Sequence, residues 1–402
     1  MTNHWGKIKA LLNIYVVIAI VLLLLLYPFV FNRLFSLPSE SILMLAGLFG
    51  FAFANVFSKK ANVRFAPILT KCIIAQVLIW FLYSLLHNDS SYLTRVFVII
   101  LVSLILSLLE RTNNTSKFIN VWIYLICFFS VGALLTFILH FIGIISPLVV
   151  TENIDGRPLY CFGLSCSNFI AGNVIRPSGY FDEPGALAYW GIFALLFNRL
   201  FIKNNKVEVI TIISLFSTLS AAYFVQIALY FIFFYTKNIK NAILPMILIG
   251  GIVVLGYSKV SDNEIIQRYT FERFEGGSIR SSRTELSEMA KQKFETSPII
   301  GVGAREFEKE YMSDNPYEIP AKDGIIGLII TYLPLIVVLI KFGLQHKDVL
   351  FACLILVAGY LQRPFHVNVL HYLMLYLFVI LVCSFYGKPR ALSQNINCHN
   401  LL

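Results

Sequence analysis

Charged side chains are scarce in this sequence. They make up 13% of its 402 residues, whereas 58% of the residues are hydrophobic. A water-soluble domain carries about a quarter of its residues as Asp, Glu, Lys or Arg. The scarcity of charge therefore excludes a soluble globular protein and indicates a chain that places much of its surface in lipid.

Sequence signatures of several common sites are also missing. The chain has no glycine-rich phosphate-binding loop, and its histidines and cysteines form no cluster with metal-ligand spacing. We therefore expect no metal and no other cofactor. The first apolar run, residues 10–31, is long enough to span a membrane and has no small-residue cleavage site, so we interpret it as a span and not as a cleaved signal peptide. The formal charge of +10 fits basic cytoplasmic loops, so we predict no nucleic-acid partner.

Long apolar runs follow one another along the chain, and their basic flanks predict the topology. Lysine and arginine are enriched in cytoplasmic loops, so the two lysines before the first run place the N-terminus inside. Alternation from there predicts an all-α, polytopic membrane protein that forms one transmembrane domain over residues 1–402, with about twelve spans. The predicted spans cover residues 10–31, 37–57, 67–86, 92–109, 118–145, 184–201, a pair within 207–235, 243–257, 325–340, 349–360 and 370–386.

The run 207–235 decides the topology of everything after it. It is too long for one upright span and short for two. Small and hydroxylated residues from Ser217 to Ala222 interrupt it, and such residues tolerate an unwound or re-entrant backbone. A single crossing would place the later basic loops outside, whereas two short helices place them inside. We adopt the pair of helices because it agrees with the positive-inside rule.

Two large loops then share the outer face, residues 146–182 and residues 259–322. The first ends in the segment 176–185, where an arginine and two acids precede an apolar run that begins with proline. Charges at a membrane boundary are costly unless they pair or face water, so the segment is either a functional site or an interfacial anchor. Cys161 and Cys166 share this loop, and in an oxidising compartment they either form a local disulfide or remain thiols.

The second loop contains a predicted amphipathic helix, which lies either on the membrane surface or against the spans. Ser282-Arg-Thr-Glu285 has the spacing of a capping box, and apolar residues follow at helical spacing. We therefore expect Arg280 and Arg283 at the start of this helix, where free N–H groups and the helix dipole favour an anion. Two guanidinium groups there would clamp a diphosphate, and the alternative is a solvated charged face.

Together these motifs resemble the bacterial O-antigen polymerase and O-antigen ligase superfamily. The resemblance extends from about residue 176 to about residue 335. The motifs that carry it are Arg176-x-x-Gly179-x-Phe181-x-Glu183-Pro184 before a span, the interrupted span at 217–222, Arg283-Thr-Glu285 on an amphipathic helix that ends in the turn 298–303, and Asn315 followed by Gly324-Ile-Ile-Gly327.

This resemblance implies a metal-independent glycosyltransferase of the bacterial inner membrane, active on the periplasmic face. Its donor and acceptor would be undecaprenyl-diphosphate-linked oligosaccharides, and a chain-length regulator and a flippase would be its partners. Ligases of this family carry a His-Asn pair before the Gly-x-x-Gly span, but here the pair is Asp314-Asn315. We therefore predict an O-antigen polymerase, with ligase, capsule-polysaccharide polymerase and a non-enzymatic flippase of the lipid-linked glycan as alternatives.

The resemblance also implies roles for particular residues. Arg176 and Arg283 would stabilise the negative charge that builds on the departing diphosphate. The acceptor hydroxyl needs a base, which we leave open among Glu183, Asp182, Asp314 and two histidines. The predicted catalytic set is Arg176, Glu183, Arg283 and Asp314, and the predicted substrate-binding set is Gly179, Tyr180, Arg280, Asn315, Arg363, His366 and His371.

Overall fold

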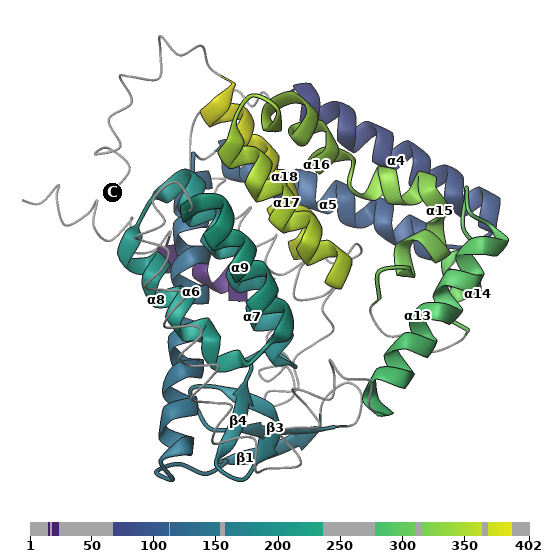
Figure 1. Ribbon diagram of the computed structural model, residues 1–402. Coiled ribbons are helices and arrows are strands. Elements are labelled where there is room, and N and C mark those ends of the chain that lie inside the picture. Colours follow the sequence, from purple (N-terminus) through teal and green to yellow (C-terminus); the bar gives the residue numbers. More distant parts are fainter. Residues whose placement is uncertain are drawn as a thin grey trace, which may run out of the picture. The chain divides into compact units, whose positions relative to one another are not determined.

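The computed structural model of the chain describes residues 15–16, 18–23, 67–111, 113–152, 157–235, 278–309, 315–363 and 369–387 (Figure 1). The described part is mostly helical. Five of its helical segments are long and apolar enough to cross a membrane, namely Pro67–His87, Thr115–Phe141, Pro184–Ile202, Glu318–Gly343 and Val369–Tyr386. Two shorter apolar helices cover Ser91–Ser107 and Ala221–Tyr235. These helices are consistent with a membrane protein; the predicted spans 37–57 and 243–257, and most of 10–31, lie outside the described residues.

The chain divides into two compact units, the first made of residues 1–71, 98–223 and 368–402 and the second of residues 72–97 and 224–367. The first unit includes most of α5 (Ser91–Arg111) and all of α6 (Thr115–Phe141), α7 (Pro184–Phe197), η1 (Asn198–Ile202), α8 (Asn205–Leu215), η2 (Phe216–Thr218) and α18 (Val369–Tyr386). Both α7 and α18 are apolar all round and almost entirely buried. Such helices belong inside a bundle, and α7 packs against both α6 and α8, which also contact each other.

The predicted interruption of the run 207–235 is confirmed. The chain leaves the helical conformation after η2, where Leu219 adopts φ 47°, and α9 (Ala221–Tyr235) follows. The hydroxyl of Tyr223 donates a hydrogen bond to the carbonyl of Ile212 at 2.7 Å. A continuous helix would separate these two residues by about 16 Å, so the chain bends back at this point. The run therefore forms two short helices, as the small residues predict.

The loop 146–182 contains a sheet that the all-α prediction misses. Its strands are β1 (Val149–Glu152), β2 (Pro158–Cys161), β3 (Cys166–Ala171) and β4 (Val174–Pro177), in the order β1-β2-β3-β4 with antiparallel pairing. The sheet lies at the C-terminal end of α6 (Figure 1). Each strand has only four to six residues, and none has the regular alternation of apolar and polar residues by which a strand is predicted. Cys161 and Cys166 are register partners on β2 and β3 and form a disulfide.

The second unit contains most of α4 (Pro67–His87), the start of α5 (Ser91–Arg111), most of α9, and α13 (Ser278–Thr296), α14 (Ala304–Phe307), α15 (Glu318–Thr331), α16 (Leu333–Val338), η5 (Leu339–Gly343) and α17 (Lys347–Gln362). The predicted amphipathic helix is α13, and it packs against α15. Its contact is a small apolar cluster built on Ala290, Phe307 and Ala321. Of the two predicted placements of this helix, the structure therefore shows packing on the protein.

The predicted start of this helix is wrong. The helix begins at Ser278 and not at Ser282, so the capping-box serine lies inside it. Two glycines directly precede Ser278, and nothing between there and Ser282 breaks a helix, which allows the extra turn. Arg280 and Arg283 are consequently the third and sixth helical residues. The backbone N–H of Arg283 then falls within the internal hydrogen-bonding pattern of the helix and is not free for an anion.

Candidate functional site

The first candidate site is the segment 176–183, which joins β4 to α7 in the first unit. Three buried serines fix its backbone: Ser167 on β3, Ser165 in the turn before β3, and Ser178 in the segment itself. The hydroxyl of Ser167 accepts the N–H of Arg176 at 3.2 Å and lies 2.9 Å from its carbonyl oxygen. The hydroxyl of Ser165 accepts the N–H of Gly179 at 2.9 Å. Ser178 places its own hydroxyl 3.0 Å from the carbonyl of Cys166. The segment is therefore held in a fixed conformation next to the disulfide.

The middle of this segment turns at Gly179. Its φ of +62° is a left-handed conformation that favours glycine, and its Cα faces the side chains of Phe129 and Leu187. Tyr180 donates its hydroxyl to the carbonyl of Gly163 at 2.7 Å, and partial burial raises the pKa of this phenol. Tyr180 thus ties the segment to the turn between β2 and β3. This bond is a structural role for a residue that the sequence assigns to substrate binding.

The charged residues of the segment are partly exposed. Arg176, Asp182 and Glu183 are each half-buried, whereas the serines around them are buried. Glu183 is extended and forms the N-cap of α7, with Pro184 as the first helical residue, as the sequence predicts. The arginine and the two acids are therefore partly exposed residues within eight positions of the chain, directly before a buried apolar helix.

Two further elements of the first unit approach this segment. The tip of the interrupted span, η2, packs against both β4 and α7. Its residues Ser217 and Thr218 are buried, and their hydroxyls donate to carbonyls in the last turn of the preceding helix, α8. Tyr189 on α7 lies 3.1 Å from Nδ1 of His371 on α18, and both side chains are buried. Tyr189 follows Pro184 by five positions, so this polar pair lies about 7.5 Å deeper along α7.

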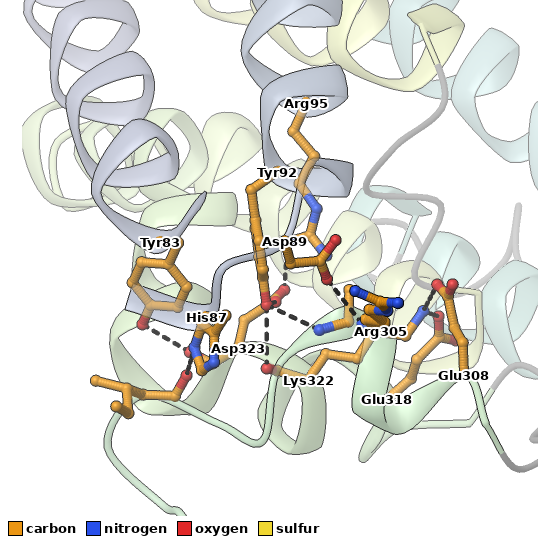
Figure 2. Close-up of polar contacts among 12 residues, drawn as sticks. Tyr83, His87, Asp89, Tyr92, Arg95, Arg305, Glu308, Glu318, Lys322 and Asp323 are labelled. Carbon is orange, nitrogen blue, oxygen red and sulfur yellow. Dashed lines mark hydrogen bonds and ion pairs between the residues drawn. The ribbon is translucent and has the colours of Figure 1, made fainter. Parts of the chain in front are cut away.

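The second unit contains a polar cluster that the sequence interpretation missed. Figure 2 shows Tyr92 and Arg95 pointing from α5 toward Asp323 in α15. Nη1 of Arg95 lies 2.5 Å from Oδ2 of Asp323, with side-chain exposures of 2% and 0%. The hydroxyl of Tyr92 donates to the other carboxylate oxygen at 3.0 Å. The guanidinium also lies 4.7 Å from the ring centre of Trp80 and 4.6 Å from that of Tyr92. This buried charge pair is thus fully surrounded by partners.

Asp323 stands where α15 kinks and meets the turn 298–303. Gly324 has φ +66°, and a Cβ there would come within 2.3 Å of the Ile299 carbonyl oxygen. Gly301 has φ +73°, and its Cβ would come within 2.2 Å of the Lys322 carbonyl oxygen. The two backbones pair directly, since the N–H of Gly303 donates to Lys322 at 2.9 Å. Gly301 and Gly324, which belong to two different motifs, therefore serve the same purpose. Each allows the turn 298–303 and the backbone of α15 to approach closely.

The structure places the other predicted residues as follows. Asp314 and His366 lie outside the described residues, and of Arg280 and Arg283 only the backbone is described. Asn315 is buried and accepts the N–H of Tyr317 at 2.9 Å, which is a local turn contact. Arg363 ends α17 in the second unit, whereas His371 belongs to the first. Of the predicted set, the structure brings together Arg176, Gly179, Tyr180 and Glu183.

The buried cluster had a signal in the sequence. Arg95 falls inside the predicted span 92–109, and ionisable residues within spans are rare and need partners.

Among the residues that the structure describes, no group of three or more His, Cys, Asp or Glu is arranged to hold a metal ion. The sequence matches no protein-family model, and no curated protein matches it. The resemblance to the polymerase and ligase superfamily therefore stays a prediction from the motifs.

Proposed function

We propose that the protein is an O-antigen polymerase of the bacterial inner membrane, a glycosyltransferase that joins undecaprenyl-diphosphate-linked oligosaccharide repeat units on the periplasmic face. The observation that carries the proposal is the rigid placement of Arg176. Its backbone is fixed by Ser167, its side chain is partly exposed, and the same segment continues through two partly exposed acids into a buried helix. A positioned guanidinium at a membrane boundary suits a lipid diphosphate.

Contacts in the second unit support the proposed topology of about twelve spans. The turn after α4 and the segment before α14 touch each other, since Asp89 accepts the N–H of Arg305 at 2.8 Å. His87 lies 3.2 Å from the carbonyl oxygen of Ile300 in the same segment. A single crossing of the run 207–235 would put these two segments on opposite faces of the membrane. Their contact therefore favours the pair of short helices, with both large loops on one face.

The proposed reaction breaks the bond between the anomeric carbon of the donor and its diphosphate. The acceptor hydroxyl oxygen forms the new bond to that carbon and gives its proton to a base, while the diphosphate leaves with the electron pair. A fixed guanidinium stabilises the charge that develops on the leaving group. Arg176 fills this role in the first loop, and Arg283 on α13 remains its proposed counterpart in the second.

Glu183 is the best-placed base in the described part of the first loop. It is partly exposed and stands in the same fixed segment as Arg176. His371 is fully buried and already lies 3.1 Å from Tyr189, so we assign it to the support of α7 instead. Asp314 remains a proposed alternative in the second loop.

A flippase of the lipid-linked glycan is the second candidate, and one observation favours it. Transporters place ionisable residues among their membrane helices, and the pair Arg95–Asp323 is buried between two apolar helices. However, Asp323 also accepts a hydrogen bond from Tyr92, and two aromatic rings flank the guanidinium of Arg95. Such contacts are expected of an ion pair that holds two helices together, not of a charge that moves during transport.

Deletion of the gene in its source strain, followed by a lipopolysaccharide gel, separates the candidates. A polymerase deletion reduces the O-antigen ladder to core plus one repeat unit, and wild type restores the ladder while Arg176→Ala does not. Arg157→Ala, which removes another arginine from the same loop, is the matched control and should restore it. Loss of every O-antigen band would indicate a ligase or flippase, and an unchanged ladder would exclude O-antigen synthesis.

A further inference from the structure

A surface pocket of the second unit borders the turn 298–303 at Gly303, but none of the residues predicted to be catalytic or substrate-binding lines it. It has a volume of about 390 Å³ and lies between the turn after α4 and the segment 302–309. Small-molecule sites occupy about 300–1,000 Å³, so this pocket is of the size that holds one small ring. Its wall consists of Val302, Gly303 and five polar side chains, which are His87, Asp89, Arg305, Glu306 and Lys309.

His87 is fixed in one orientation in this wall (Figure 2). Its Nε2 lies 3.2 Å from the carbonyl oxygen of Ile300, which can only accept, so Nε2 donates and Nδ1 of the neutral ring is an acceptor. The ring stacks on Tyr92 with 5.6 Å between centroids. Gly303 makes room for it, since a Cβ at that position would come within 2.9 Å of Nδ1. The pocket therefore has a hydrogen-bond acceptor at a defined place.

The charges of the pocket balance. The carboxylate of Asp89 accepts the N–H groups of Ser91 at 2.9 Å and of Arg305 at 2.8 Å, and Glu306 forms an ion pair with Lys309. Two acids and two bases face the space, so neither an anion nor a cation is selected by net charge. The guanidinium of Arg305 makes no hydrogen bond to any residue in the described part of the chain. It is available as a donor to a ligand.

We propose that this pocket binds a sugar through its hydroxyl groups. A hydroxyl both donates and accepts, so neighbouring hydroxyls of one ring can donate to Nδ1 of His87 and to Asp89 while another accepts from Arg305. A charged ligand of either sign would face two like charges in the same space. The choice of a saccharide among hydroxyl-rich ligands rests on the proposed function.

Saturation-transfer NMR on the purified full-length protein in detergent tests the proposal, with methyl glycosides of glucose, galactose, N-acetylglucosamine and glucuronic acid as probes. A neutral glycoside should bind to wild type. His87→Gln keeps a donor for Ile300 but removes the acceptor at Nδ1, and it should weaken binding about fivefold, as expected for one hydrogen bond. Arg305→Gln should do the same. Lys291→Gln, which removes a charge from an exposed position on α13 outside the pocket, should leave binding unchanged.

Equal glycoside binding by wild type and all three variants would overturn the proposal. So would a wild-type protein that shows an intact thermal unfolding transition but binds no glycoside. Binding of inorganic diphosphate in place of the glycosides, abolished by Arg305→Gln, would make the pocket an anion site. Each variant is compared at equal folded fraction, and Arg305→Lys serves if Arg305→Gln does not fold. The two proposals can fail separately. If the glycosides bind as expected but deletion of the gene leaves the O-antigen ladder unchanged, the polymerase proposal is refuted and the sugar-binding proposal stands.

Discussion

Arg95 and Asp323 are 228 positions apart in the sequence and form a buried ion pair between α5 and the kink of α15. Removing two charges from water is costly, and their attraction offsets this cost only with good geometry and further hydrogen bonds. Tyr92 supplies such a bond, and the rings of Trp80 and Tyr92 flank the guanidinium. The pair therefore fixes the kink from which the turn 298–303 is held.

Loss of one partner of this pair should destabilise the protein more than loss of both. Arg95→Met or Asp323→Leu leaves one uncompensated buried charge, which costs about 3–5 kcal/mol. The double variant leaves no charge and should unfold at a higher temperature than either single variant. Thermal unfolding in detergent, analysed as a double-mutant cycle, measures this coupling. Additive effects of the two substitutions would contradict this coupling. As a control, Lys291→Gln removes one partner of an exposed ion pair on α13 and should have no measurable effect on the unfolding temperature.

Glycine substitutions separate backbone strain from a steric clash. Gly172 has φ +56°, and a Cβ at that position would meet nothing within 4 Å. Gly172→Ala should therefore lower the free energy of unfolding only by the strain of a left-handed alanine, about 1–2 kcal/mol. Gly301→Ala and Gly324→Ala carry the same strain and also drive the methyl group into the opposing backbone. These two should lower the unfolding temperature much further or prevent folding. Equal shifts for all three variants in detergent would contradict the close approach of the two backbones.

The sequence predicts most of the described apolar helices because their signal is local. Apolar runs bounded by polar residues give α4, α5 and α6 to within a few positions, and the small residues after Phe216 give the interruption before α9. The start of α13 is misplaced because Ser282 has a capping-box pattern, although the helix continues back to the preceding glycines.

The remaining features depend on contacts between distant positions. The strands of the first loop are short, and the register of β3 and β4 is held by serine hydroxyls that resemble ordinary loop residues in sequence. Arg95 and Asp323 each read as a charge near the end of a span, and only the folded chain shows that they meet. The motif glycines are recognisable in the sequence, but the reason for them is the neighbouring backbone, which only the fold brings close.

Asp89 should make the stability of the protein depend on acid. Burial favours the neutral acid, but the backbone N–H groups of Ser91 and Arg305 outweigh it and hold the pKa of Asp89 below its ordinary value of 3.8. A carboxyl with a lowered pKa in the folded state stabilises the protein above its unfolded-state pKa and loses that contribution as the pH falls through the folded value. The difference in unfolding temperature between wild type and Asp89→Asn should therefore be constant near pH 6 and shrink below about pH 4. A gap that is independent of pH would contradict this.

The disulfide Cys161–Cys166 should stabilise the sheet that carries Arg176. It closes a short loop, for which the entropy of the unfolded chain gives about 2 kcal/mol. Replacement of both cysteines by serine should lower the unfolding temperature and expose the loop to limited proteolysis. Mass mapping of alkylated peptides from natively prepared protein tests the bond itself, and free thiols at both positions would disprove it. Cys353→Ser, at a buried free cysteine, controls for the loss of a thiol.

Arg176 should contribute through geometry as well as charge. Its backbone is fixed by Ser167, so the guanidinium extends from a rigid position, and a lysine there keeps the charge but not the planar bidentate donor. In a polymerisation assay with purified protein and undecaprenyl-diphosphate-linked repeat units, Arg176→Ala should reduce turnover about 100- to 1,000-fold, the usual effect of removing a donor that stabilises transition-state charge. Arg176→Lys should retain part of the activity. Ser167→Ala, which loosens the backbone without touching the guanidinium, should fall between Arg176→Lys and wild type. Full activity in Arg176→Ala would remove this arginine from the mechanism and leave the second loop to supply the charge.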